Sequence, residues 1–264
     1  MNDISAIIIT HRNPSYLDLC LKSLTENKVL NETEIIVVVD GFVDESMPVL
    51  EKYKSDISIL PLKENKGQNI AHNYGVFQAS NDWILILNDD QVAPRKWDKR
   101  LIGAIRENTA ITINQIEPNP SIFNSFIIKD FGPVDNFNYS QFLDYEIELK
   151  TTNINNNKIT TNDGSTWPPF MPKRLFMGVG GIDTSYPVAS YADHDLFTKL
   201  KIMNVTCSRY HLLHFYHFAN RAEGINNKEI LGAQYFNFKW GFPSTFNKDN
   251  SHTPNNQLIK GIQF

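Results

Sequence analysis

The sequence has few cysteines, no surplus of basic charge and no long apolar run, and each absence excludes a class of protein. Two cysteines in 264 residues are too few for a disulfide framework, so we expect a reducing, cytoplasmic environment. The 25 Lys and Arg against 29 Asp and Glu give a net charge of −4, which argues against a general binder of nucleic acid or anionic membranes. No apolar run approaches the roughly 20 residues of a membrane-spanning helix. The first residues, MNDISAIIIT, lack the basic start of a signal peptide, so no cleaved signal is expected.

Phosphate-binding glycine loops are also missing where they would matter. The sequence contains no GxxxxGK[ST] stretch, and the turn after the first apolar run has no GxGxxG. The glycine-rich stretch at residues 178–181 lies far downstream, outside that context. If the chain binds a nucleotide, its phosphates must therefore be met by a metal ion rather than by a glycine nest.

What is present in the first third is an alternation of apolar runs with helical periodicity. Between the runs lie helical patterns, the first with Asn13 as N-cap and Pro14 at its first position. A later one is expected to begin at Pro94 and to turn Trp97, Leu101 and Ile105 inward. The runs that predict buried strands are residues 4–10, 34–39, 57–62, 83–87 and a shorter one near 110–113. This pattern predicts an α/β, Rossmann-like, mostly parallel sheet with helices on both faces.

The periodicity fades in the middle of the chain and returns later. Residues 114–165 are rich in Asn, Pro and Gly, and both a mobile loop over the site and a solvated excursion are open interpretations. A helix is expected from residue 192 and a strand over 205–218. The predicted division is a nucleotide-binding half at 1–110, an acceptor- and metal-binding half of the same domain at 111–222, and a C-terminal extension at 223–264.

Three polar clusters follow the predicted strands, at the sheet edge where open parallel sheets bind ligands. They are the segments Thr10–Asn13, Asp40–Gly41 and Asn88–Asp90. Adjacent carboxylates such as Asp89 and Asp90 repel each other unless a positive charge lies beside them. Oxygen ligands suit Mg²⁺ or Mn²⁺, so a divalent cation is one explanation, and capping of the helix at Pro94 is the other.

Two further groups of polar side chains lie in the second half. Asp193 and Asp195 flank His194 at a helix start, where one carboxylate is either a general base or part of the N-cap. Tryptophans at 167 and 240 either stack on sugar rings or pack in the core.

Three histidines, His211, His214 and His217, recur every third residue along the expected last strand. On a regular strand the first and third share a face and the second points the other way, which argues against a three-histidine metal site. One of them joining the acidic pair stays open, as does a purely structural role.

The order of these features resembles the family 2 glycosyltransferases, which have the GT-A fold. The resemblance covers roughly residues 4–106 and 170–240. It is carried by AIIITHRNPSYLDLCLKSL, EIIVVVDGFVDES, NKGQNIAHNYG, WILILNDDQ and MGVGGIDTSYPVASYADHDLFTKL, five segments in the family's order.

For the nucleotide, the resemblance implies that Asp40 accepts a hydrogen bond from the base, most often the uracil N3–H. Asn88 stands where the family's DxD motif has its first carboxylate, and it or Asp89 is expected to face the ribose or a metal-bound water. His72 stands where arginine is usual. The other positions that the resemblance assigns to the nucleotide are Thr10, His11, Arg12, Asn65, Gly67 and Asn73.

For catalysis, the resemblance implies a Mn²⁺ or Mg²⁺ ion held by Asp90 and His217, with His214 as the second choice. Asp193 matches the family's catalytic base, although Ala192 replaces the glutamate that usually precedes it. The residues assigned to the donor sugar or the acceptor are Gly180, Gly181, Asp195 and Trp167.

The leading hypothesis is a metal-dependent glycosyltransferase that moves a sugar from a nucleoside diphosphate, most often UDP, to an acceptor hydroxyl. The acceptor would be a glycan, a lipid-linked molecule or a protein, and a single displacement would invert the anomeric configuration. A sugar nucleotidyltransferase is one alternative, but the THRNPS loop lacks the glycine-rich basic character it needs. A non-catalytic carbohydrate-binding module is the other, in view of Asn88 and Ala192.

Overall fold

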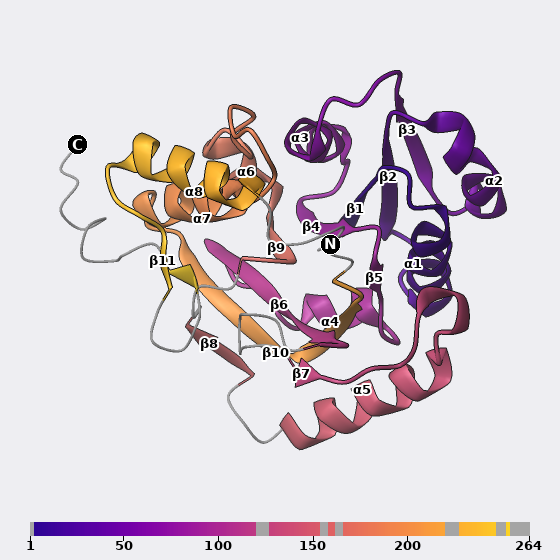
Figure 1. Ribbon diagram of the computed structural model, residues 1–264. Coiled ribbons are helices and arrows are strands. Elements are labelled where there is room, and N and C mark those ends of the chain that lie inside the picture. Colours follow the sequence, from indigo (N-terminus) through magenta and orange to yellow (C-terminus); the bar gives the residue numbers. More distant parts are fainter. Residues whose placement is uncertain are drawn as a thin grey trace.

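Four parallel strands form the first half of the central sheet. The computed structural model describes residues 3–119, 127–153, 158–161, 166–219, 227–246 and 252–253 (Figure 1). The four strands are β1 (Ile4–Thr10), β2 (Glu34–Asp40), β3 (Ser58–Leu62) and β4 (Trp83–Asn88). They lie in the order β3-β2-β1-β4, so the chain moves outward from β1 and then returns to its other side.

The sheet continues beyond β4 in mixed orientation. Its further strands are β5 (Gln91–Val92), β6 (Thr109–Glu117), β7 (Ile127–Ile128), β8 (Ile159–Thr161), β9 (Pro169–Pro172) and β10 (Thr206–His217). Strand β9 lies antiparallel between β4 and β6, and β10 runs parallel to β6 with β5 antiparallel on its other side. In the described part of the chain this makes a ten-stranded sheet, because β7 also pairs with β6 and β8 with β10. A separate antiparallel pair joins β11 (Thr245–Phe246) to β12 (His252–Thr253).

Helices cover both faces of the sheet, as the sequence predicts. They are α1 (Pro14–Asn27), α2 (Val43–Tyr53), α3 (Gln68–Gln78), α4 (Trp97–Ile102), the 3-10 helix η1 (Val134–Asn136), α5 (Tyr139–Asn153), α6 (Lys173–Gly178), α7 (Ala192–Ile202) and α8 (Asn227–Trp240). Alternate residues of β1 serve the two sides: Ile4 and Ile8 pack in a cluster with α1, α2 and α4, whereas Ile7 and Ile9 pack with α3, α6, α7 and α8. Figure 1 shows α1 and α2 well apart from the group of α6, α7 and α8.

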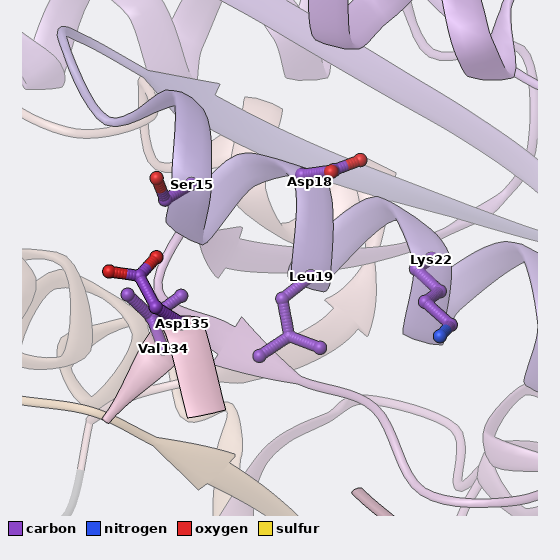
Figure 2. A pocket seen from close by; sticks show the side chains of 6 residues that line it. All are labelled: Ser15, Asp18, Leu19, Lys22, Val134 and Asp135. Atoms are coloured by element: carbon purple, nitrogen blue, oxygen red, sulfur yellow. The ribbon is translucent and has the colours of Figure 1, made fainter. Parts of the chain in front are cut away.

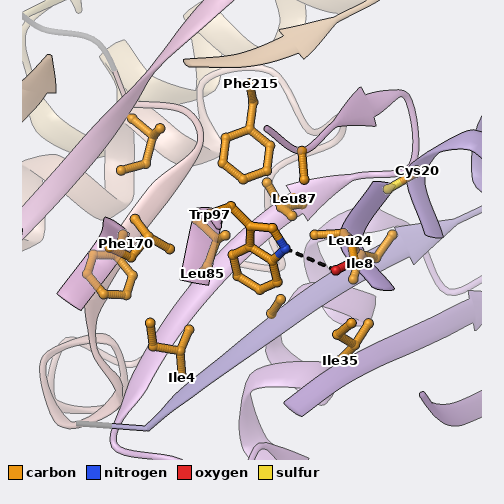
Figure 3. Close-up of a cluster of buried hydrophobic side chains, with 14 of the residues drawn as sticks. Ile4, Ile8, Cys20, Leu24, Ile35, Leu85, Leu87, Trp97, Phe170 and Phe215 are labelled. Carbon is orange, nitrogen blue, oxygen red and sulfur yellow. Dashed lines mark hydrogen bonds between the residues drawn. The ribbon is translucent and has the colours of Figure 1, made fainter. Parts of the chain in front are cut away.

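Trp97 is the largest fully buried side chain of the first cluster. Its indole Nε1 donates a hydrogen bond of 3.0 Å to the carbonyl of Leu24, which ties α4 to α1 beneath the sheet (Figure 3). The indole ring also lies edge-on to Phe215 of β10, with the ring centroids 6.5 Å apart. The N-terminal helices and the last long strand therefore share one core.

One helix start agrees with the sequence prediction and another differs from it. Asn13 occupies the N-cap position of α1 and Pro14 follows it, but the Asn13 side chain caps nothing, because it points to Asp89 of the site. The helix expected to begin at Pro94 begins at Trp97 instead, after Lys96 in the left-handed region. Ile105 therefore lies beyond that helix, although it still packs against the core.

The segment 114–165, predicted to be a loop, contains the 15-residue helix α5. Its buried side chains are few: Phe142 and Leu143 pack with β5, β6 and β10, and Glu146 is fully buried among polar partners. A helix with so narrow an apolar stripe and a buried acidic residue gives little periodic signal, which is why the pattern was weak. Of the polar tract at Asn153–Asn157, residues 154–157 lie outside the described residues, as does most of the chain after residue 246.

The expected arrangement of the three histidines on alternating faces is wrong because β10 is not regular. Its register against β6 shifts between Tyr210 and His214. As a result His211 and His214 both contact the same amide, that of Asn114 on β6, at 3.4 and 3.3 Å. The face argument holds only for a strand without such an irregularity.

In the residues that the structure describes, no helix combines the length and the apolar character needed to cross a membrane.

Candidate functional site

Asp89 lies at the point where β4 leaves the sheet, next to the end of β1. Thr10 donates a hydrogen bond of 2.8 Å to one of its oxygens and Asn13 one of 3.3 Å to the other. Burial and the adjacent charge of Asp90 raise the pKa of Asp89 to about 7, and the two hydrogen bonds oppose that rise. Three of the polar residues that the sequence places at strand ends are thus joined at one edge of the sheet.

Asp40, at the end of β2, binds the loop that leads into α3. Its two carboxylate oxygens accept hydrogen bonds from the backbone amides of Lys66 (2.6 Å) and Gly67 (3.0 Å). Gly67 has a φ of +89°, a conformation that only glycine adopts readily. The Cβ of any residue replacing Gly41 would lie 2.8 Å from the Asn65 nitrogen, so both glycines let this loop approach β2. Asp40 holds the loop in place, and the remaining lone pairs of its carboxylate could accept a hydrogen bond from a nucleobase.

The segment after β1 forms a small aromatic and basic cluster. His11 donates from Nδ1 to the Asp40 carbonyl at 2.7 Å, and its Nε2 lies 3.2 Å from the Asn65 amide nitrogen, which donates to it. Arg12, with a φ of +59°, places its guanidinium 3.5 Å from the centre of the Phe42 ring. The structure thus brings together Asp40 and three of the residues that the resemblance assigns to the nucleotide.

Asn88, where the family has a first carboxylate, faces the start of α3. Its side-chain oxygen accepts a hydrogen bond of 3.2 Å from Gln68, and its backbone amide donates to the side chain of Gln91 at 3.0 Å. This position at the sheet edge is the one expected from the sequence.

Asp90 and His217, which lie far apart in sequence, meet at the end of the sheet. The Asp90 Oδ2 and His217 Nε2 atoms are 3.4 Å apart, while the other ring nitrogen, Nδ1, lies 2.8 Å from a carboxylate oxygen of Glu117. Burial alone would lower the pKa of His217, but the charges and hydrogen bonds of Asp90 and Glu117 outweigh it and raise the pKa to about 10. The two carboxylates favour a positive charge at this place, which a protonated imidazole or a cation can supply.

A divalent ion fits the pair Asp90 and His217, but not as a cage built from the protein alone. In the described ranges no group of three or more His, Cys, Asp and Glu side chains is arranged to hold a metal. Mg²⁺ keeps several waters and binds through one or two carboxylates together with substrate phosphates, and imidazole is acceptable to Mn²⁺. A carboxylate oxygen and an imidazole nitrogen 3.4 Å apart suit two neighbouring ligands of such an ion. Glu117 would then orient the histidine from the other side of its ring.

Asp193 lies at the first turn of α7 with about a quarter (26%) of its side chain exposed. The hydroxyl of Thr166 donates a short hydrogen bond to its Oδ2. His194 is buried beside it, and its Nδ1 lies 2.7 Å from the Ser244 hydroxyl. A partly exposed carboxylate that accepts a hydrogen bond from a hydroxyl is suited to accept a proton.

Helix α3 connects this region to the edge of the sheet where β1, β2 and β4 end. Trp167, next to Thr166 in the chain, packs its ring 5.1 Å from that of the buried His72. Asn73 forms two hydrogen bonds with the backbone of Ile182, of 2.7 and 2.8 Å. The sequence assigned Asn73 to the nucleotide, but both polar atoms of its side chain hold this turn.

The turn that contains Gly180 and Gly181 is tightly enclosed at one of these two glycines. Gly180 and Gly181 have φ angles of +78° and +66°. A Cβ on Gly181 would lie 2.6 Å from the side-chain oxygen of Asn73, while one on Gly180 would meet nothing. Gly181 is therefore required by the close approach of α3.

Asp195, assigned to the sugar or acceptor, is fully buried and faces α8. One oxygen lies 2.8 Å from the Lys239 ammonium and accepts a hydrogen bond of 2.8 Å from Trp240, and the other is 3.4 Å from the Lys199 ammonium. Tyr186 also reaches this carboxylate, at 3.4 Å. These contacts describe a clamp between α7 and α8, and Trp240 belongs to the packing rather than to an open surface.

A pocket of about 290 Å³ lies between α1 and η1 (Figure 2). It is lined by Ser15, Asp18, Leu19, Lys22, Val134 and Asp135. None of the predicted site residues is in its wall, so it is separate from the clusters described above.

A comparison with known protein families identifies the family of this chain. The sequence model of the family described as glycosyl transferase family 2 matches residues 5–165, more than half of the chain. The chain belongs to glycosyl transferase family 2.

Curated family 2 relatives share moderate identity with it. A hyaluronan synthase of Pasteurella multocida is 29% identical over 153 residues, which cover 57% of this chain and 15% of that protein. An uncharacterized glycosyltransferase of Haemophilus influenzae is 23% identical over 201 residues, which cover 75% of this chain and 61% of that protein. The chain thus spans less than two thirds of the length of these relatives.

Solved structures agree on the fold. S. aureus TarS superimposes with a TM-score of 0.60 at 16% identity, over 91% of this chain and 44% of that one. A structure of S. aureus TarS 1-349 in complex with UDP gives a TM-score of 0.56 at 17% identity, over 91% of this chain and 72% of that one. The predicted GT-A type of α/β fold is confirmed.

Two residues that contact the predicted site residues are not themselves predicted from the sequence. Glu117 stands at the end of β6, in a segment predicted to be a loop, and Thr166 precedes a Trp-Pro-Pro stretch without any motif. Each is found only through its contact, with His217 and Asp193 respectively. Glu117 shares one feature with Asp40, because each is an acidic residue at the end of a strand.

Proposed function

We propose that this chain transfers a sugar from a nucleoside-diphosphate donor, in the first place a UDP-linked one, to an acceptor hydroxyl. The observation that carries the proposal is the meeting of Asp90 and His217 at the sheet edge where β1, β2 and β4 also end. Family membership supports the reaction class, and the UDP in the complex of S. aureus TarS supports the choice of base. Residues 1–110 would bind the nucleotide, and residues 111–222 would supply the histidine and the acceptor side.

In this proposal Asp90 and His217 hold a Mn²⁺ or Mg²⁺ ion at the donor diphosphate. When bound, the ion supplies positive charge against the charge that develops on the leaving group. The loop held by Asp40 and the side chains of His11 and Asn65 orient the nucleotide.

Asp193 would take the proton from the acceptor hydroxyl as that hydroxyl attacks the anomeric carbon. A two-step retaining route needs a carboxylate beside the sugar as nucleophile. Asp195, the nearest carboxylate in sequence, is fully buried and ion-paired with lysines, so it is not placed for that role. This favours a single displacement with inversion. The acceptor class, whether glycan, lipid-linked molecule or protein, and a cytoplasmic location remain predictions from the sequence.

Replacing the proposed base tests the reaction directly. In Asp193→Asn we expect UDP release from a UDP-sugar in the presence of acceptor and Mn²⁺ to fall by about 10²-fold or more, because the amide cannot accept the proton. Calorimetry should show UDP binding unchanged, since the residue does not contact the nucleotide in the proposal.

Asp144→Asn, which alters an exposed carboxylate on α5, serves as the control and should retain full turnover. Unchanged turnover in Asp193→Asn would remove Asp193 from the mechanism. Glycan binding without any binding of UDP and Mn²⁺ would instead favour a non-catalytic carbohydrate-binding module.

A further inference from the structure

Strand β10 carries three more residues than the strand it pairs with. Residues Thr206–Tyr210 lie opposite Thr109–Ile113 of β6, and His214–Tyr216 lie opposite Asn114–Ile116. Residues 211–213 therefore have no partner in β6 and form an insertion in the ladder. Such an insertion removes ladder hydrogen bonds, so it persists only where other groups replace them.

The insertion has the same length as the spacing of the histidines. Had the first register continued to the end of β6, His214 would lie beside Glu117. Because residues 211–213 have no partner in β6, His217 lies beside Glu117 instead. Its Nδ1 atom is 2.8 Å from the Glu117 carboxylate and its Nε2 atom is 3.4 Å from Asp90. The insertion thus decides which of two histidines reaches the site.

An ion pair between α4 and α5 holds the insertion. The guanidinium of Arg100 forms two hydrogen bonds with the carboxylate of Glu146, of 2.6 and 2.7 Å. Arg100 also donates a short hydrogen bond to the carbonyl of Leu212, within the insertion. Glu146 accepts the backbone amide of His214 at 3.2 Å, at the residue where pairing resumes. The middle of the displaced backbone and the residue that follows it are therefore bound by the same pair.

The ion pair between Arg100 and Glu146 is almost completely buried. Glu146 is fully buried and the Arg100 side chain is 11% exposed. A buried ion pair is often no more stabilising than apolar side chains of similar volume, and a documented use of such pairs is to fix register. Here the hydrogen bonds of the pair end on backbone atoms of β10.

We propose that Arg100 and Glu146 are positioning residues, a register clasp that keeps His217 rather than His214 beside Glu117 and Asp90. The inference rests on the proposed function, because it explains how His217 is placed at the donor diphosphate. It assigns a role in that site to α5, a helix that contributes no residue to it.

The test replaces both members of the clasp by apolar residues, Arg100→Met with Glu146→Leu, so that no unpaired charge is left buried. The control is Arg95→Met with Asp144→Leu, which removes a second arginine–carboxylate pair, exposed, between the segment before α4 and α5. Cooperative thermal unfolding shows that each variant is folded.

The first measurement is Mn²⁺ affinity in the presence of UDP, from the electron paramagnetic resonance signal of free Mn²⁺. We expect the clasp variant to bind about 10-fold or more weakly and the control to bind as the unaltered protein does. His217→Gln should weaken binding in the unaltered protein and cause little further loss in the clasp variant, because His217 has already left its place. A merely structural role would leave the His217 effect intact, and that result would overturn the clasp.

The second measurement does not depend on the function. Amide hydrogen exchange in the 207–217 peptide should be about 10-fold or more faster in the clasp variant than in the control. Equal exchange in the two would overturn the clasp whatever the metal data show. If the unaltered protein binds neither Mn²⁺ nor UDP, the proposed function fails, and hydrogen exchange alone then decides the inference.

Discussion

At the scale of single residues, the site works through partners that hold each functional side chain. Asp89 is held by Thr10 and Asn13, and Asp193 is held by Thr166. Thr10 and Asn13 belong to a polar cluster visible in the sequence, because they follow a strand. Thr166 does not, since nothing near it in sequence marks a strand end or a helix cap.

Thr166 offers a test of how tightly Asp193 must be held. Thr166→Val keeps the shape of the side chain and removes the hydroxyl that donates to Asp193. We expect kcat to fall about 10-fold with the KM for the donor unchanged, because a hydrogen bond to a charged group contributes about 1.5–3 kcal/mol. Steady-state kinetics checks this. Thr166→Ser should restore most of the rate, and a valine variant with full kcat would contradict the positioning role.

His72 is buried, and we expect it to make the stability of the protein sensitive to acid. Burial lowers the pKa of His72 to about 3, so the folded state keeps the ring neutral while the unfolded chain protonates it near pH 6.5. Below pH 6.5 the unfolded state therefore binds more protons, and stability falls as the pH falls, by about 1.4 kcal/mol per unit from this group.

His72→Gln should flatten the dependence of unfolding free energy on pH between 6.5 and 4, relative to the unaltered protein. Urea unfolding at several pH values measures it. The same slope in both proteins would show that His72 is not kept neutral in the folded state.

At the scale of elements, the sequence predicts best those strands and helices that a single local pattern determines. The parallel strands β1, β2 and β4 are continuous apolar runs, and their ends place Asp40 and Asn88–Asp90 at one edge. Helix α5 and the insertion in β10 are joined by tertiary contacts of Glu146 with Arg100 and the His214 backbone, which no local pattern encodes. These two elements, like the antiparallel strand β9, are parts of the fold that could not be predicted.

The clamp between α7 and α8 is a second feature that no local sequence pattern predicts. The position of Asp195, two residues after Asp193, suggests a role in the site, but its contacts hold the two helices together. Asp195→Asn should destabilise the protein by about 2–3 kcal/mol, since it leaves the Lys199 and Lys239 ammonium groups facing a buried amide. Thermal and urea unfolding check this, and donor binding should be retained by the folded protein.

Asp183→Asn is the matched change, because Asp183 also pairs with Lys239, at 2.6 Å, but lies nearer to the surface. It should cost less than about 1 kcal/mol. Equal effects of the two substitutions would mean that burial does not distinguish the pairs.

At the scale of the whole molecule, the site is assembled from distant parts of one sheet. The side proposed to bind the nucleotide comes from the ends of β1, β2 and β4, and His217 comes from the end of β10, beyond β9 and β6. A ligand that contacts both sides should therefore stabilise the entire fold and not one half of it.

UDP with Mn²⁺ should raise the melting temperature more than UDP with EDTA. At a ligand concentration 100 times the dissociation constant the gain is about 2.7 kcal/mol, or roughly 5 °C or more for a chain of this size. His217→Gln should remove most of the difference between the two conditions. The same shift in Mn²⁺ and EDTA would mean that the ion does not take part in UDP binding.

The position of β9 in the sheet affects how the protein folds during its synthesis. Strand β4 is synthesised by residue 88, yet its neighbour in the finished sheet, β9, begins only at Pro169. On the ribosome the first four strands can pair as soon as they emerge, and the outer edge of β4 then stays open while some 80 further residues are translated. An unpaired strand edge invites pairing with other chains. Nascent chains of this protein should therefore depend on chaperones during that interval, and a ribosome stalled just before β9 is where that dependence would be greatest.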